Sequence, residues 1–144
     1  GLITLVHGGI DIGIPGEWAS PRQTRILYEA VRPKKLIVAH MGGWQLWEEV
    51  KDWLQDTELL FDTAFSIGSI AYQEDFPKES RVKQLSKQKF EELVKELGAE
   101  RVLFGTDSPW TEHKEQIGLI RSSSLPDEEK ALILGGNAKK LLNL

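Results

Sequence analysis

Four polar side chains each end a short apolar run in this sequence: His7, His40, Asp62 and Asp107. Imidazole nitrogens and carboxylate oxygens bind divalent metals, and a carboxylate beside a metal-bound water can take up its proton. One such histidine is more often a core residue bonded to a backbone carbonyl, whereas four polar residues at equivalent places favour a shared site. His7 and Asp107 are therefore candidate metal ligands, and Asp107 is also a candidate proton shuttle. His40 is a candidate ligand or a group that holds the reacting water or substrate.

The four apolar runs predict short buried strands. They span Leu2–His7, Lys35–His40, Glu58–Thr63 and Arg101–Asp107. Near-continuous apolar runs are typical of the parallel sheets of α/β proteins, in which strands are covered on both faces. Chemistry in these folds gathers at the carboxyl ends of the strands, which is where the four polar residues fall.

Alternation along each strand predicts which residues share a face with the polar ends. Counting back by two from those ends gives a mostly apolar face that includes Leu5, Leu36, Val38, Leu60 and Leu103. The opposite face, suited to packing beneath helices, carries Val6, Ala39, Phe61, Val102 and Phe104.

Helical patterns lie between and after the strands. They cover Ser20–Arg32, Trp44–Leu54, Ser86–Gly98, Glu112–Ser122 and Leu125–Leu144. Ser20 is the expected N-cap of the first helix, whose apolar stripe is Ile26, Leu27, Ala30 and Val31. In the last segment, Gly135 and Gly136 are expected to end one helix and Asn137 to cap another. This alternation predicts one α/β domain of parallel βα units over residues 1–144.

The loops after the strands are the other candidates for function. The longest irregular stretch, Ser66–Gln84, follows the third strand and is either a lid or a surface insertion. Ile10–Trp18 and Trp110 are candidates for substrate contact, although a tryptophan such as Trp110 more often packs beneath a helix. The glycine pairs after His7 and His40 permit tight turns and close approach of a substrate to the backbone.

Composition excludes several classes of function. The formal net charge is −4 with no basic stripe, which argues against nucleic-acid binding. No apolar run approaches the roughly 20 residues of a membrane span, and no basic stretch precedes an apolar run as in a signal peptide. The chain has no cysteine, so a metal would need His, Asp or Glu ligands. These features suit a cytoplasmic enzyme.

At these motifs the chain resembles the amidohydrolase-related family of metal-dependent TIM-barrel hydrolases. The family includes pyrone-dicarboxylate lactonases and aminocarboxymuconate semialdehyde decarboxylase. The resemblance is carried in order by "LVHGG", "LIVAHMGGW", "LLFDTAF", "VLFGTDSPW" and "LGGNAKKLL". It implies that the chain is the C-terminal half of a (β/α)8 TIM barrel, strands five to eight.

The resemblance also implies roles for individual residues. His7 matches the metal-binding histidine of the fifth strand, and His40 matches the sixth-strand histidine that positions water or a substrate oxygen beside the metal. Asp107 matches the eighth-strand aspartate, which is a metal ligand and proton shuttle. Asp62 matches a supporting position without a catalytic role. The family's first-strand His-x-His pair has no counterpart here, and the third histidine, His113, is expected at the surface.

Two explanations fit a chain of about half the typical barrel length, which is about 250 residues. We expect a fragment of a longer enzyme, completed by the missing N-terminal half-barrel. The alternative is a natural half-barrel that closes as a homo-oligomer, because a lone half would expose strand edges and apolar interior.

The function expected from the resemblance is hydrolysis of an ester, lactone or amide bond in a small molecule by a metal-activated water. Zinc is the expected metal and manganese the alternative. Non-oxidative decarboxylation is a second reading. A catalytically incomplete domain with a structural or assembly role is a third, because the His-x-His pair is missing.

Overall fold

Four parallel strands form the sheet in this computed structural model, which describes residues 2–71, 73–75 and 82–144. They are β1 (Thr4–Val6), β2 (Leu36–Val38), β3 (Leu60–Asp62) and β4 (Val102–Leu103), adjacent in sequence order. Each neighbouring pair is parallel, and the register aligns Val6, Val38, Phe61 and Val102 in one row. The predicted α/β class with a parallel sheet is confirmed.

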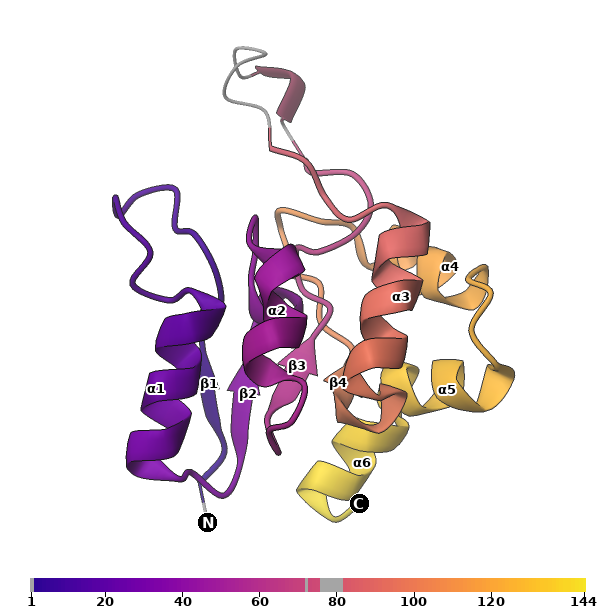
Figure 1. The fold of residues 1–144 in the computed structure, drawn as a ribbon. Coiled ribbons are helices and arrows are strands. Elements are labelled where there is room, and N and C mark those ends of the chain that lie inside the picture. The colour runs from indigo at the N-terminus through magenta and orange to yellow at the C-terminus, as the bar shows by residue number, and fades with distance from the viewer. Residues whose placement is uncertain (1, 72, 76–81) are drawn as a thin grey trace.

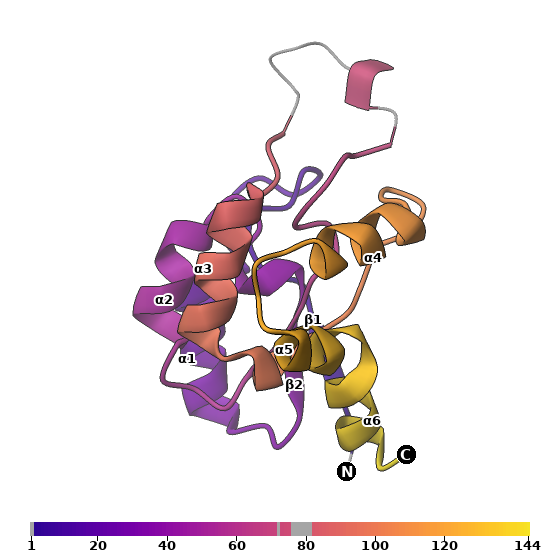
Figure 2. The same cartoon turned by 90° about the vertical axis from the view of Figure 1, so that its right-hand side faces the viewer.

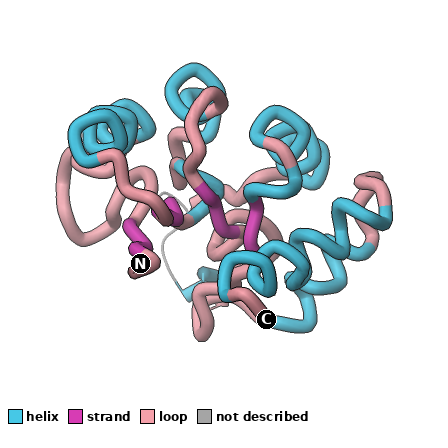
Figure 3. Tube along the Cα trace, turned by 90° about the horizontal axis from the view of Figure 1, so that it is seen from below, coloured by secondary structure: helices cyan, strands magenta, loops and turns pink. Residues whose placement is uncertain are grey.

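Helices follow the strands and lie outside their arc (Figures 1 and 3). They are α1 (Pro21–Val31), α2 (Trp47–Leu54), α3 (Lys87–Leu97), α4 (His113–Arg121), α5 (Asp127–Ala131) and α6 (Asn137–Leu142). Short 3-10 turns occur at His40–Gly42, Gln73–Asp75 and Ala99–Arg101, and a π-helical segment at Leu132–Gly136. Among the described residues, no helix is long and apolar enough to cross a bilayer.

Local hydrogen bonds mark the ends of the helices, and the predicted cap at Ser20 is confirmed. The Ser20 hydroxyl accepts from the backbone N–H of Gln23 at 3.4 Å, so Ser20 caps α1. Ser86 caps α3 in the same way, through the N–H of Lys89 at 3.2 Å. Gly98 ends α3 with a φ of 89°, a conformation that favours glycine.

The core lies between the sheet and helices α2 and α3. Its strand residues include Leu36, Val38, Phe61 and Val102, all buried. The face predicted for Leu36 and Val38 is therefore wrong, because both pack with the helix-side core. Alternation fails here because the strand ends at Val38 and a turn follows, with a positive φ of 60° at His40.

The other face of the sheet is open beside β1. Leu5 is 60% exposed, and it aligns with Ile37, which aligns in turn with Leu60. Leu103 on β4 is buried, since the chain's last segments pack near it. The sheet thus presents half of a barrel interior, uncovered on the β1 side.

Helix α1 departs from its predicted stripe. Ile26, Leu27 and Val31 are exposed, while Pro21 and Thr24 are the buried residues of this helix. The physical reason is the surroundings of the helix: α1 contacts α2, and Ile26 lines an open hollow between these two helices instead of being buried. The side view in Figure 2 shows α1 at the opposite side of the sheet from α5 and α6.

Asn137 has a different role from the predicted cap. Its side chain is buried, and Nδ2 donates to the carbonyl oxygens of Ala99 at 2.7 Å and Val102 at 2.8 Å. The chain runs into α6 through the π-helical segment, so no separate cap is needed. Through these two hydrogen bonds, Asn137 connects the start of α6 to the start of β4.

Arg101 joins the end of α3 to the loop after α2 through three backbone carbonyls. Its guanidinium donates to the carbonyls of Leu97 at 2.5 Å, Gln55 at 2.9 Å and Thr57. It also lies 5.5 Å from the centroid of the Phe61 ring. Partial burial lowers the pKa of this guanidinium below its ordinary value. Among the described ion pairs, no carboxylate pairs with it directly to offset this effect.

We expect Arg101→Ala to lower the free energy of unfolding by about 2–3 kcal/mol, because three carbonyls lose a charged donor. Arg101→Lys should recover little of this loss, since an ammonium cannot reproduce the guanidinium fork. Urea denaturation measures both effects. Arg121→Ala, an exposed arginine on α4, is the control and should change stability by less than about 0.5 kcal/mol. Equal losses for Arg101→Ala and Arg121→Ala would contradict this role.

Candidate functional site

A cavity of about 830 Å³ lies at the carboxyl ends of the strands. The four predicted site residues line it together: His7, His40, Asp107 and Trp110. The other lining residues are apolar or aromatic apart from Asp11 and Gln73; they are Ile10, Ile12, Trp44, Phe65, Ile70, Ala71 and Val82. The carboxyl ends of parallel strands meet at one edge of a sheet, so residues far apart in sequence come together there.

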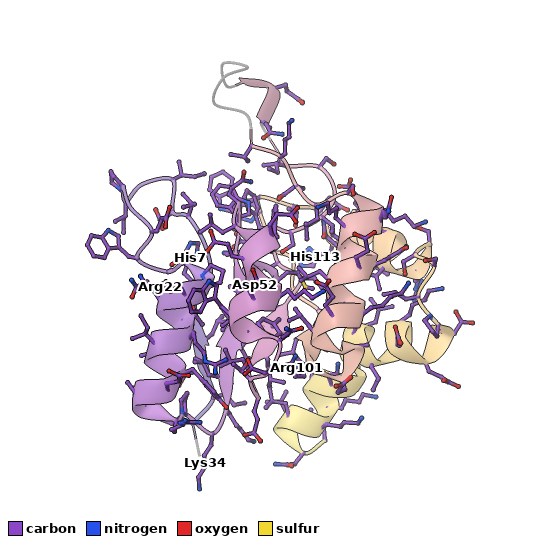
Figure 4. The ribbon with its side chains drawn as sticks, in the orientation of Figure 1. His7, Arg22, Lys34, Asp52, Arg101 and His113 are labelled. Atoms are coloured by element: carbon purple, nitrogen blue, oxygen red, sulfur yellow. The ribbon has the colours of Figure 1, made fainter. Side chains whose placement is uncertain are left out.

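His7 directly follows β1 and is exposed. It lies near the start of α1 (Figure 4). Its Nε2 is 3.1 Å from the carbonyl oxygen of Ile10. A carbonyl only accepts hydrogen bonds, so Nε2 carries the hydrogen and the neutral ring has its lone pair on Nδ1. Nδ1 is therefore the atom of His7 that suits a metal.

His40 lies beside His7, with ring centroids 5.0 Å apart and ring planes at 69°. Its Nδ1 is 2.8 Å from the carbonyl oxygen of Ala64, so the hydrogen is on Nδ1 and the lone pair on Nε2. The two imidazoles thus offer complementary nitrogens, Nδ1 from one ring and Nε2 from the other.

Asp107 and Trp110 approach the cavity from the turn after β4. Asp107 is exposed and has a positive φ of 55°, an uncommon conformation outside glycine that clusters at functional sites. The N–H of Trp110 donates to the Asp107 carbonyl at 3.0 Å, which closes the turn. Trp110 is 49% exposed, so it forms part of the cavity wall rather than packing beneath a helix.

Asp62 lies beneath the site and does not line the cavity. Its Oδ1 accepts from the backbone N–H of His40 at 2.9 Å and of Ala64 at 3.1 Å. Burial raises the pKa of this carboxyl above its ordinary value, although the two N–H donors act in the opposite direction. Asp62 thus bonds to the backbone of His40 and Ala64 and is not among the residues that line the cavity.

His113 is separate from the cavity lining. It is the exposed first residue of α4, and its Nε2 is 3.3 Å from the hydroxyl of Thr106. Figure 4 shows it on the α4 side of the molecule, away from His7.

Sequence reasoning did not find two aromatic residues of the cavity, Trp44 and Phe65. Their rings are 5.4 Å apart. Trp44 was expected to begin a helix, but α2 starts at Trp47 and the backbone of Trp44 instead pairs with Gly8 and Ile10. The Phe65 backbone has a positive φ of 51°, which no sequence pattern indicates.

The glycines near His7 serve a close approach between two chain segments. A Cβ added at Gly9 would lie 2.2 Å from the backbone of Trp44, and the φ of Gly9 is 108°. Glycine is required there because the loops after β1 and β2 touch backbone to backbone. The described stretches of the Ser66–Gln84 loop supply Ile70, Ala71, Gln73 and Val82 to the cavity, whereas residues 72 and 76–81 of the predicted lid lie outside the described residues.

The donor atoms that line the cavity are of types that bind divalent metals. Two imidazoles and a carboxylate are ligands that zinc and manganese accept. Within residues 2–71, 73–75 and 82–144, however, no three His, Asp or Glu side chains are gathered closely enough to hold an ion.

Four parallel strands with outer helices and polar residues at the strand ends define half of a TIM-barrel enzyme fold. The sequence model of the amidohydrolase family matches residues 1–144, and the chain belongs to this family. No curated protein matches it at a significant level.

Solved structures with this fold include an amidohydrolase from Burkholderia multivorans with bound zinc, at 16% identity and a TM-score of 0.63. That match covers 86% of this chain and 49% of the other. A dihydroxybenzoic acid decarboxylase from a Polaromonas species, with bound manganese and the inhibitor 2-nitroresorcinol, matches at 18% identity and a TM-score of 0.58, over 88% of this chain and 42% of the other.

The 5-carboxyvanillate decarboxylase from Sphingomonas paucimobilis matches at 17% identity and a TM-score of 0.59. It covers 99% of this chain and 50% of its own length. The chain thus spans about half the length of these structures, as expected from the resemblance to half of a barrel.

Proposed function

We propose that this chain carries one half of the active site of a metal-dependent hydrolase that cleaves an ester, lactone or amide bond in a small molecule. The observation that supports this most is the convergence of His7, His40 and Asp107 on one cavity at the strand ends. The metal-bound amidohydrolase among the similar structures supports the same reading.

Completion of the site by another half-barrel is part of the proposal. The described residues lack a three-ligand group, and the sequence lacks a His-x-His pair. Further strands would continue the barrel by pairing along the edge of β1, and they would cover the open face around Leu5. We propose an N-terminal half-barrel as the partner, with a second copy of this chain as the alternative.

In this proposal His7 contributes Nδ1 and Asp107 a carboxylate oxygen to a divalent metal, zinc or manganese. When bound, such a metal lowers the pKa of a coordinated water and polarises a carbonyl. Asp107 takes the proton from the attacking water at its free carboxylate oxygen and passes it to the leaving group. His40 accepts a hydrogen bond at Nε2 from a water or from a substrate hydroxyl. Trp110, Trp44 and Phe65 offer flat apolar surface to the substrate.

Decarboxylation is the second candidate, since two of the similar structures are decarboxylases of aromatic acids. Parallel assays distinguish the two activities in a protein that contains this chain within a complete barrel. Release of titratable acid from lactones or esters, or of free amine from amides, supports the hydrolase, and release of carbon dioxide from aromatic acids supports the decarboxylase. Either activity should be lost with a chelator and restored by zinc or manganese. An activity that ignores the chelator would contradict the proposal.

For the 144-residue chain alone, we expect less than one tightly bound metal per chain, because two imidazoles and one carboxylate are too few and too dispersed. Elemental analysis of protein purified without chelators measures this. The same chain in a complete barrel should hold about one metal, and His7→Ala should lower that content while His113→Ala leaves it unchanged. One metal per chain in the isolated half, together with a dimeric mass, would instead favour closure by a second copy.

A further inference from the structure

His40 is held at three of its polar atoms. Its backbone N–H donates to Asp62 Oδ1 at 2.9 Å, and its carbonyl oxygen accepts from the indole N–H of Trp47 at 2.9 Å. Its ring Nδ1–H donates to the carbonyl oxygen of Ala64 at 2.8 Å. Among the described contacts, only Nε2 of this residue has no hydrogen-bond partner, and the residue lines the cavity.

A single carboxylate oxygen controls two of these three contacts. Oδ1 of Asp62 accepts the His40 N–H and also the N–H of Ala64 at 3.1 Å. The carbonyl of Ala64 is the group that receives the ring hydrogen of His40. Asp62 therefore holds the backbone of His40 in place directly. It holds the imidazole ring indirectly, through the Ala64 carbonyl to which the ring bonds.

The conformation of this segment needs such support. His40 and Met41 have positive φ angles of 60° and 52°, a region in which non-glycine residues are strained. Asp62 is the last residue of β3, so its carboxylate is carried by the sheet rather than by a loop. The bonds from the N–H groups of His40 and Ala64 to Oδ1 of Asp62, at 2.9 Å and 3.1 Å, offset this strain.

The Ala64 carbonyl also keeps the ring hydrogen of His40 on Nδ1, the less favoured nitrogen of a free neutral imidazole. A free neutral imidazole of histidine carries its hydrogen mainly on Nε2, whereas the Ala64 carbonyl requires it on Nδ1. If the Ala64 carbonyl moved, the hydrogen would return to Nε2. That atom would then donate to the cavity instead of offering a lone pair.

We propose that Asp62 is a positioning residue: through its bonds to His40 and Ala64 it keeps the Nε2 lone pair of His40 directed to the cavity. This inference rests on the proposed role of His40, but it concerns a geometry that can be tested in the absence of any activity. It assigns Asp62 no contact with substrate or metal.

The test is long-range ¹H–¹⁵N NMR of the histidine rings in the 144-residue chain at about pH 8.5, where an imidazole of ordinary pKa near 6.5 is neutral. We expect the Nδ1–H tautomer for His40 in the wild type. Asp62→Asn should preserve it, because the amide oxygen accepts both N–H groups. Asp62→Ala should convert more than half of His40 to the Nε2–H tautomer. The rings of His7 and His113 are internal controls, and Leu93→Ala, which removes a buried side chain of α3, controls for general destabilisation.

A folded Asp62→Ala chain with the wild-type tautomer would overturn the proposal, as would a wild-type His40 that carries its hydrogen on Nε2. If Asp62→Ala does not fold, the test is the rate of amide hydrogen exchange at the His40 N–H, compared between Asp62→Ser and Asp62→Asn. Faster exchange of the His40 N–H in Asp62→Ser than in Asp62→Asn supports the proposal, and equal rates overturn it. Failure of the proposed function would show separately, as full activity of a complete enzyme bearing His40→Ala.

Discussion

Asp107→Asn is expected to lower kcat about 10²–10⁴-fold in a complete barrel that contains this chain, which is the range for loss of a general acid–base group. Asparagine keeps the size of the side chain and one oxygen for a metal. It cannot take up a proton at neutral pH, so the step that removes the proton from water loses its acceptor. Because Asp107 is exposed, the substitution should leave the free energy of unfolding nearly unchanged.

Asp11 provides the matched control for this experiment. It lines the same cavity, but its Oδ1 already accepts from the N–H groups of Gly13 at 2.7 Å and Ile14 at 3.0 Å. Asp11→Asn retains that turn and should change kcat less than about threefold, well below the general acid–base range. Steady-state kinetics and metal content are measured for both variants. Equal effects of the two substitutions, or a normal kcat for Asp107→Asn with metal bound, would contradict the role assigned to Asp107.

Phe61→Ala should be the most destabilising single substitution considered, with a loss of about 3–5 kcal/mol in the free energy of unfolding. Phe61 is fully buried on β3, in the row between Val38 and Val102. Its ring also supports the turn that carries His40, since a Cβ added at Gly42 would lie 2.9 Å from a ring carbon. Removing the ring leaves a cavity between the sheet and the helices and removes the contact beneath that turn.

Urea denaturation followed by circular dichroism measures this loss. Phe61→Leu, which keeps most of the apolar volume, should cost about 1–2 kcal/mol. Val31→Ala is the surface control; Val31 is 63% exposed, so its truncation should change stability by less than about 0.5 kcal/mol. A small domain is stable by about 5–15 kcal/mol, so Phe61→Ala should shift the midpoint clearly. A loss of stability below about 1 kcal/mol would contradict the buried packing of Phe61 between Val38 and Val102.

Local patterns predicted the elements of this fold well because their causes are local. Apolar runs marked the four strands, and Ser20 marked the start of α1 through a hydrogen bond within three residues. The polar strand ends also predicted that His7, His40 and Asp107 would share one cavity, since parallel strands place their carboxyl ends together.

Tertiary structure alone decided the features that depend on distant neighbours. Val38 packs in the helix-side core, because β2 ends at this residue and a turn follows. The packing of α1 leaves Val31 exposed. Asn137 donates to the carbonyl oxygen of Val102, 35 positions earlier in the chain, instead of capping its own helix. Trp44 lines the cavity, and its backbone pairs with the loop after β1. Residue type and spacing therefore determined which groups could do chemistry. The atoms that face the cavity were decided by contacts between strands, such as those of Asp62 with His40, because hydrogen bonds across the sheet leave no periodic trace in the sequence.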